Sequence, residues 1–193
     1  MNIHGVRSYG DVFSGRSLVH QSLASFSINV TGIDPSDELI AIAKEHVRQD
    51  SELARRVTYE IDTIEDHAKR NPKKYDAVVL SEVIEHVNEQ EAFLKLCIDV
   101  VKPGGSIFLS TFNKTIISYI WGIFLMEDIF KVLPKDTHQW KKFISHEETQ
   151  RIFEKYNCQV VKVNGLLYQH WNNDWKWTKS TGVTYLQHAI KNE

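Results

Sequence analysis

The stretch "INVTGIDPSDELIAIAKEHVRQ" (residues 28–49) decides the fold class of this chain. Its first six residues form a short apolar run rich in β-branched side chains, which predicts a strand. Pro35 follows closely, and the acids Asp37 and Glu38 are typical of the first turn of a helix, where backbone N–H groups favour negative charge. Apolar residues then recur at helical spacing. The stretch therefore predicts a strand followed by an amphipathic helix, the repeating unit of α/β proteins.

The same alternation continues along the chain. Further strands are predicted at residues 57–61, 75–81, 106–111, 158–165 and 183–190. Helices are predicted over residues 89–102 and from Ser145, which has the spacing of a capping box with Glu148. The run "YDAVVLS" (75–81) is almost continuously apolar, as in a strand buried on both faces of a parallel sheet. These elements predict an open α/β sandwich around a mostly parallel sheet.

Length and composition favour a single domain over residues 1–193. The chain is 42% hydrophobic and 25% charged, which suffices to bury one core. Lys and Arg number 23 and Asp and Glu 25, so we expect no nucleic-acid partner at a net charge of -2. Cys97 and Cys158 stand among apolar residues and are predicted to be buried, reduced thiols rather than a disulfide.

One segment is apolar almost all round. "TIISYIWGIFLMEDIFKVLP" (115–134) predicts an inserted helix or helix pair at about residues 115–140. No run reaches the roughly 18 apolar residues that span a bilayer, so the chain is expected to be soluble or peripheral. Two interpretations of the insertion stay open: residues 115–133 lie in a membrane interface, or they form a lid packed on the sheet.

Asp34 directly follows the strand at residues 28–33. An acid at the carboxyl end of such a strand can bind both ribose hydroxyls of an adenosyl group. The alternative is a helix N-cap ahead of Pro35, and the sequence gives no reason to prefer either interpretation.

The second candidate cluster is "SEVIEHV", which leaves the most buried strand with Ser81, Glu82, Glu85 and His86. Ligands collect at this edge of open α/β sheets. Two carboxylates and an imidazole one helical turn apart suit a divalent ion such as Mg²⁺ or Zn²⁺. The alternative is a solvated helix start, where acids are favoured by the helix dipole.

Together these motifs carry a family resemblance. In this order, "VTGIDPSDELI", "YDAVVLSEVIEHV", "VKPGGSIFLST", "PKDTHQWKKF" and "VNGLLY" closely resemble the ubiquinone-biosynthesis O-methyltransferases, which use S-adenosylmethionine (SAM). The resemblance implies a Rossmann-like class I methyltransferase sandwich with an antiparallel C-terminal strand. It implies SAM as cofactor, with Asp34 as the ribose acid, Ser81 lining the pocket and Gly15 in the cofactor loop. It also implies that Glu82, Glu85 and His86 hold a divalent metal, usually Mg²⁺.

The implied reaction is methyl transfer to a phenolic hydroxyl of polyprenylated dihydroxybenzoate or demethylubiquinol. His138 is the candidate general base, with a structural histidine as the alternative. The resemblance further implies the matrix face of the mitochondrial inner membrane, or the cytoplasm of a bacterium, and an assembly with other ubiquinone-biosynthesis proteins.

The N-terminal region departs from the family pattern. In "DVFSGRS", Phe13, Arg16 and Ser17 stand at positions that are small or glycine in the family loop, and only Gly15 is retained. The first strand, expected within "GVRSYGDVF" (5–13), and the N-terminal helices are therefore atypical or missing. Two alternatives follow: a non-catalytic shortened variant that acts as a scaffold, or a methyltransferase for another small phenol or amine.

Overall fold

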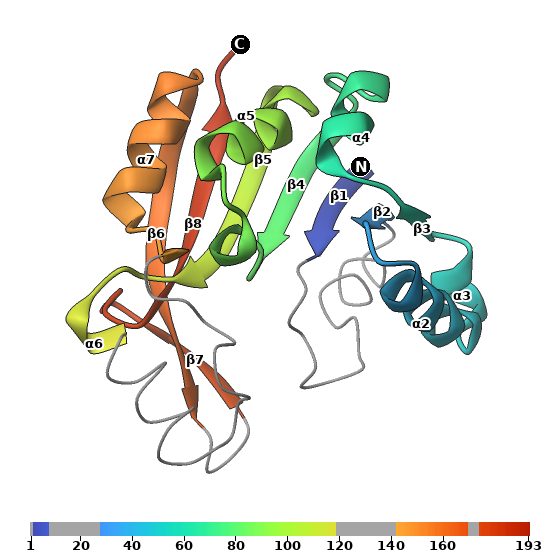
Figure 1. The fold of residues 1–193 in the computed structure, drawn as a ribbon, viewed down its shortest axis with the longest axis horizontal. Coiled ribbons are helices and arrows are strands. Elements are labelled where there is room, and N and C mark those ends of the chain that lie inside the picture. Colours follow the sequence, from blue (N-terminus) through green and yellow to red (C-terminus); the bar gives the residue numbers. More distant parts are fainter. Residues whose placement is uncertain (1, 8–27, 119–141, 170–173) are drawn as a thin grey trace.

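Eight strands form one sheet in the computed structural model, which describes residues 2–7, 28–118, 142–169 and 174–193 (Figure 1). The strands are β1 (Asn2–Arg7), β2 (Asn29–Asp34), β3 (Val57–Ile61), β4 (Tyr75–Ser81), β5 (Val101–Phe112), β6 (Cys158–Gln169), β7 (Asp174–Thr178) and β8 (Thr184–Lys191). Their order is β3-β2-β1-β4-β5-β8-β6-β7. The five strands from β3 to β5 are parallel, and β8 is antiparallel to both β5 and β6. The predicted fold class, a mostly parallel sheet closed by an antiparallel strand, is confirmed.

A first strand is present, and it lies in the middle of the sheet. β1 pairs with β2 from Asn2 to Val6 and with β4 from Ile3 to Arg7. It begins and ends earlier than the segment 5–13 in which the sequence places it. Because both neighbours offer backbone hydrogen bonds over this length, the ladder on either side specifies the strand more strongly than its weak apolar pattern does. The sheet is therefore continuous from β3 to β7.

The helices cover both faces of the sheet. Their bounds are α2 (Asp37–Arg48), α3 (Ser51–Ala54), α4 (Ile64–Arg70), α5 (Gln90–Asp99), α6 (Ile116–Ser118) and α7 (His146–Lys155). Figure 1 shows α4, α5 and α7 over one face, where they enclose the larger hydrophobic core. The helix α2 packs on β2 and β3 with a smaller core on the opposite face, since neighbouring strand residues point to opposite sides. Residues 8–27 lie outside the described ranges, so the prediction that the N-terminal helices are atypical or missing stays a prediction, and the expected insertion beyond α6 also lies outside them.

Local sequence signals explain where several of these elements begin. Ser36 caps α2 by accepting a hydrogen bond from the Leu39 backbone N–H, and Ser145 caps α7 through that of Glu148, which confirms the predicted helix start. In β4, Ala77 and Val78 point to opposite faces and are both 0% exposed, as the continuous apolar run predicts.

The structure differs from the sequence prediction around "PGG" (103–105). The helix α5 ends at Asp99, and β5 already begins at Val101, which pairs with Tyr75. The next pair is Ala77 with Ser106, so the glycines lie in an irregular excursion within the strand. A Cβ atom on Gly105 would lie 2.6 Å from a methyl carbon of Val101, which explains the need for glycine there. The strand β7 was not predicted, and β6 is longer than predicted.

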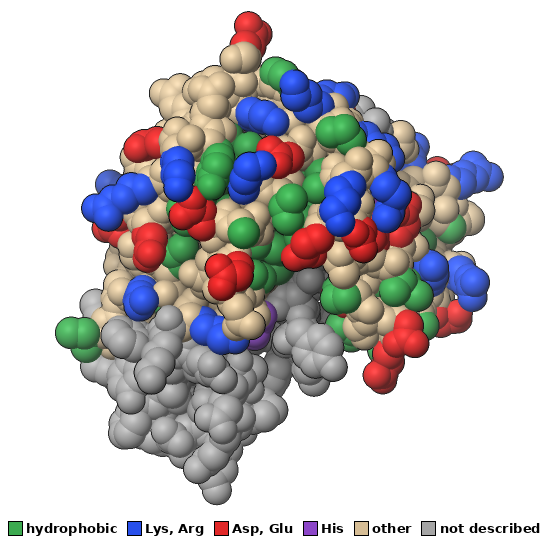
Figure 2. Space-filling model, turned by 45° about the horizontal axis from the view of Figure 1, so that its top comes forward, with side chains coloured by type: hydrophobic (Ala, Val, Ile, Leu, Met, Phe, Trp, Pro, Cys, Tyr) green, Lys and Arg blue, Asp and Glu red, His purple; other side chains and the backbone are tan. Residues whose placement is uncertain are grey.

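Charged side chains of both signs are interspersed over the face that Figure 2 shows, with hydrophobic side chains between them. Cys97 and Cys158 are buried and free, as predicted. None of the helices in the described ranges has the length and hydropathy needed to cross a bilayer.

Candidate functional site

The candidate site lies at the carboxyl edge of the parallel strands, where the strand order reverses. From β1 the chain proceeds outward through β2 to β3, and from β4 it proceeds the other way to β5. Ligands of open α/β sheets bind at such a switch point. The register places Arg7, the last residue of β1, beside Ser81, the last residue of β4, and Ser81 beside Ser110 of β5. Asp34 ends β2 on the other side of β1.

Asp34 is not the cap of the following helix. Its carboxylate oxygen Oδ1 accepts a hydrogen bond of 2.8 Å from the Ser36 backbone N–H, while the cap itself is Ser36. Its backbone carbonyl accepts the N–H of Asp62 at 3.1 Å. Asp34 is only 2% exposed. The sequence left the capping role open, and the structure assigns it to Ser36, which leaves Asp34 as a buried acid at the sheet edge.

Ser81 is half-buried at the end of β4, one strand pair from Ser110. The Ser110 hydroxyl lies 3.5 Å from the Ser81 hydroxyl, a long and therefore weak hydrogen bond. The two hydroxyls thus lie together at the carboxyl edge of the sheet.

Glu82 adopts a backbone conformation that is rare for residues other than glycine. Its φ is +50°, in the left-handed region, and its N–H donates to the Ser110 carbonyl at 3.0 Å. For a residue with a Cβ atom this conformation costs roughly 1–2 kcal/mol. Such outliers cluster at functional sites, where the surrounding structure holds the strain.

The residues after Glu82 form a single turn of 3₁₀ helix, Ile84–His86, rather than the start of a longer helix. Glu85 points inward and is 3% exposed, and the Thr111 hydroxyl donates to its Oε2 at 2.8 Å. A solvated helix start is therefore excluded for Glu85. The Gln90 amide donates to the carbonyls of Ile84 at 3.0 Å and Lys142 at 2.6 Å, which ties this turn to the segment before α7.

His86 is half-buried beside this turn. Burial lowers the pKa of His86, and the positive charge of Lys142 lowers it further. The imidazole is therefore predominantly neutral at pH 7, which is the protonation state in which a histidine ligates metal. Glu82, Glu85 and His86 thus lie close together in the sequence, but their ligand atoms do not all lie within 4.8 Å of one another.

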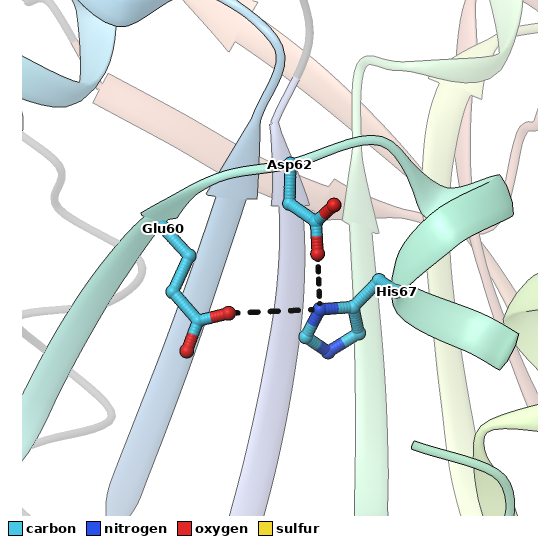
Figure 3. A group of neighbouring side chains, drawn as sticks. All are labelled: Glu60, Asp62 and His67. Carbon is cyan, nitrogen blue, oxygen red and sulfur yellow. Dashed lines mark hydrogen bonds and ion pairs between the residues drawn. The ribbon is translucent and has the colours of Figure 1, made fainter. Parts of the chain in front are cut away.

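Within the described ranges, the residues that meet this distance are Glu60, Asp62 and His67 (Figure 3). The His67 Nδ1 atom lies 2.9 Å from Asp62 Oδ2 and 3.8 Å from Glu60 Oε2. Its Nε2 atom lies 2.7 Å from the Tyr75 hydroxyl, and the Arg70 guanidinium contacts Asp62. Because both ring nitrogens have partners and a cation already neutralises Asp62, this cluster is interpreted as a tie between β3, α4 and β4.

Two predicted site residues, Gly15 and His138, lie outside the described residues. Of the predicted membrane-contacting segment 115–133, the structure describes 115–118, in which Ile116 is exposed. Sequence reasoning missed two residues that act on the "SEVIEHV" turn (residues 81–87). Thr111 donates a hydrogen bond to Glu85, and the charge of Lys142 lowers the pKa of His86. A polar residue at the end of the neighbouring predicted strand, 106–111, is a signal that pointed to Thr111.

Comparisons with known proteins first define the class. Residues 14–163 match the family model "Methyltransferase domain". A solved SAM-dependent methyltransferase from Methanosarcina mazei has a TM-score of 0.69 at 15% identity and covers 99% of this chain and 92% of its own. The magnesium protoporphyrin IX methyltransferase from Synechocystis, solved with bound SAH, has a TM-score of 0.67 at 15% identity, over 98% of this chain and 74% of its own. The fold is that of the class I SAM-dependent methyltransferases.

Curated relatives narrow the class. Over 94% of this chain, identity is 41% to the mitochondrial ubiquinone biosynthesis O-methyltransferase of Rattus norvegicus and 40% to that of Homo sapiens. The bacterial protein of that name from Xanthomonas euvesicatoria is 35% identical over 94% of this chain and 74% of its own length. The chain belongs to the ubiquinone biosynthesis O-methyltransferase family. It spans about half the length of the mammalian relatives, 52% and 49%.

Proposed function

We propose that this protein is a SAM-dependent O-methyltransferase that methylates phenolic hydroxyls of polyprenylated ubiquinone precursors. The observation that carries the proposal is the carboxyl edge at the β1/β4 switch point, with buried Asp34 on one side and the "SEVIEHV" turn on the other. Membership of the family supplies the substrate class: 3,4-dihydroxy-5-polyprenylbenzoate and demethylubiquinol.

SAM binds in this proposal between β2 and β4. Asp34 accepts the two ribose hydroxyls through its carboxylate, Ser81 lines the pocket beside β1, and Gly15 contributes to cofactor binding. Support comes from the position of Asp34 at the end of β2, and from the finding that Ser36 rather than Asp34 caps α2.

A divalent ion, Mg²⁺ first and Zn²⁺ as the alternative, binds to Glu82, Glu85 and His86. The chemistry of the donor set fits: residues 82–86 supply two carboxylates and an imidazole whose pKa is lowered, and these side chains must draw together around the ion. When bound, the ion lowers the pKa of a phenolic hydroxyl and orients it for attack on the methyl group.

The residues of the chain contribute proximity and orientation. An in-line transfer needs the methyl donor and the phenolate oxygen held at near-attack distance, and in this proposal the two sides of the switch point hold them. His138 is proposed to accept the phenol proton.

The polyprenyl tail is proposed to follow residues 115–133, which contact the membrane peripherally. By the names of the mammalian relatives the location is mitochondrial, and we propose the matrix face of the inner membrane, in an assembly with other ubiquinone-biosynthesis proteins. If the chain is bacterial, we propose a cytoplasmic location instead.

Calorimetry and a methylation assay test the proposal together. Wild-type protein is expected to bind SAM and to methylate a catechol with a prenyl chain in the presence of Mg²⁺. Asp34→Asn should weaken SAM binding at least tenfold, whereas Ser36→Ala should cost about 1 kcal/mol of stability as a lost cap and leave SAM affinity intact. No heat at millimolar SAM supports a non-catalytic scaffold, and turnover of short phenols alone supports a different substrate.

A further inference from the structure

The inward face of β5 carries a hydroxyl where its pattern calls for an apolar side chain. This face carries every second residue of the strand, and its members Ile107, Leu109 and Thr111 are all 0% exposed. Valine would fill nearly the same volume as Thr111 without a polar group. A buried hydroxyl costs free energy unless it is hydrogen-bonded, so the residue is explained by its partner rather than by packing.

That partner is Glu85. The Thr111 hydroxyl donates to Glu85 Oε2 at 2.8 Å, and both residues are buried. A hydroxyl has one proton to donate, so this bond fixes its direction. The turn that carries Glu85, Ile84–His86, has no hydrogen bond from a capping side chain. The bond from the neighbouring strand therefore restrains the Glu85 carboxylate.

The neighbouring Tyr185 does not duplicate this role. The register places Tyr185 of β8 opposite Thr111, but its hydroxyl bonds Thr149 Oγ1 at 3.3 Å and the Ile144 carbonyl at 3.4 Å. Burial raises the pKa of Tyr185, and the negative charges of Glu85 and Glu82 raise it further.

We propose that Thr111 is a positioning residue that holds the Glu85 carboxylate in the orientation in which it binds a divalent cation. This inference rests on the metal site proposed for Glu82, Glu85 and His86. Thr111 acts through Glu85 and contacts neither substrate nor cofactor. Hydrogen bonds to metal-ligating carboxylates orient the ligand, and their loss typically weakens metal affinity about 10- to 100-fold.

Calorimetric titration with Mg²⁺ alone, in the absence of SAM and substrate, tests the inference. Thr111→Val should weaken Mg²⁺ binding about 10- to 100-fold, and Thr111→Ser, which restores the hydroxyl, should return the affinity to within a few-fold of wild type. Thr149→Val is the matched control: it removes another fully buried threonine hydroxyl, bonded to Gln187 and Tyr185 but not to Glu85. Its Mg²⁺ affinity should equal that of the wild type, even if its melting temperature falls.

A double-mutant cycle separates positioning from general damage. In a Glu85→Ala background, Thr111→Val should cause no further loss of Mg²⁺ affinity. Equal affinity of wild type and Thr111→Val overturns the positioning role, as does an equal loss in Thr149→Val. A wild type that binds no Mg²⁺ is a different result, which removes the proposed metal site itself. If Thr111→Val does not fold, Thr111→Ala removes the same hydroxyl, and the same loss is expected.

Discussion

The ammonium group of Lys142 lies close enough to the His86 imidazole to lower the pKa of His86, in addition to the larger effect of burial. The two residues are far apart in the sequence, and Gln90 joins their segments by bonding the carbonyls of Ile84 and Lys142. The charge state of the "SEVIEHV" turn is therefore set partly by the segment that precedes α7.

Lys142→Gln is expected to raise the pKa of His86 toward 6.5, its ordinary value, because one of the two causes of the shift is removed. NMR titration of the His86 ring protons measures this directly. Lys44→Gln, an exposed change on α2, serves as the control and should leave the His86 pKa unchanged. An unaltered pKa in Lys142→Gln would show that burial alone governs this histidine.

The same shift predicts a pH dependence of stability. Since the pKa of His86 is lower in the folded than in the unfolded state, the unfolded chain takes up the proton first as the pH falls below about 6.5. Through this histidine, the free energy of unfolding therefore decreases as the pH falls, and does not decrease as the pH rises. Urea unfolding of wild type and His86→Gln at pH 7.5 and 5.5 should show a smaller acid loss in the variant. An equal loss of stability in wild type and His86→Gln would contradict the lowered pKa of His86.

Glu82→Gly should stabilise the fold and impair metal binding. Glycine adopts the φ of +50° without the Cβ penalty, and the gain is about 0.5–1 kcal/mol after the added entropy of the unfolded chain. Lys73→Gly is a matched control, because Lys73 has a φ of +51° and lies in an exposed loop. Both variants should melt at a higher temperature, but only Glu82→Gly should lose Mg²⁺ affinity. Unchanged affinity would remove Glu82 from the ligand set.

His67→Ala should destabilise the protein without affecting the candidate site. The ring is 0% exposed and bridges Asp62 and Tyr75, so its removal leaves a cavity and breaks two hydrogen bonds, at a cost of about 2–4 kcal/mol. Chemical denaturation gives the loss, and a Mg²⁺ titration below the unfolding range should match that of wild type. A lost metal signal would instead make Glu60, Asp62 and His67 the metal site.

Both thiols should be inert in the native protein. Burial raises the pKa of the Cys158 thiol to about 11 and that of Cys97 still further, so little thiolate is present at pH 8. Labelling with a chromogenic disulfide reagent should be slow for the native protein and complete for two thiols in denaturant. Rapid native labelling of either residue is the contrary result.

The sequence predicted those elements that local pattern decides. The apolar run 75–81 and the strand-to-helix stretch 28–49 formed as expected, because side-chain burial alone specifies them. The sequence could point to Thr111 but not to its bond with Glu85, and it could not predict the left-handed Glu82 or the effect of Lys142 on His86, since each depends on a neighbour brought close by the fold. Asp34 was predictable in part. Its position at the end of the strand was predicted, but only the backbone geometry shows that Ser36 rather than Asp34 caps α2.

The central position of β1 has a consequence for cooperativity. Backbone ladders join β3 and β2 to the remaining strands through β1, a strand of six residues. Asp34 follows the ladder between β1 and β2, and the "SEVIEHV" turn follows the ladder between β1 and β4. The distance between these two parts of the site is therefore maintained only while β1 stays paired with both neighbours. Local unpairing of β1 would separate the two halves of the binding edge while leaving the helices in place. A ligand that contacts both halves must therefore stabilise the pairing of β1 with β2 and β4, so that ligand binding and strand pairing are thermodynamically linked.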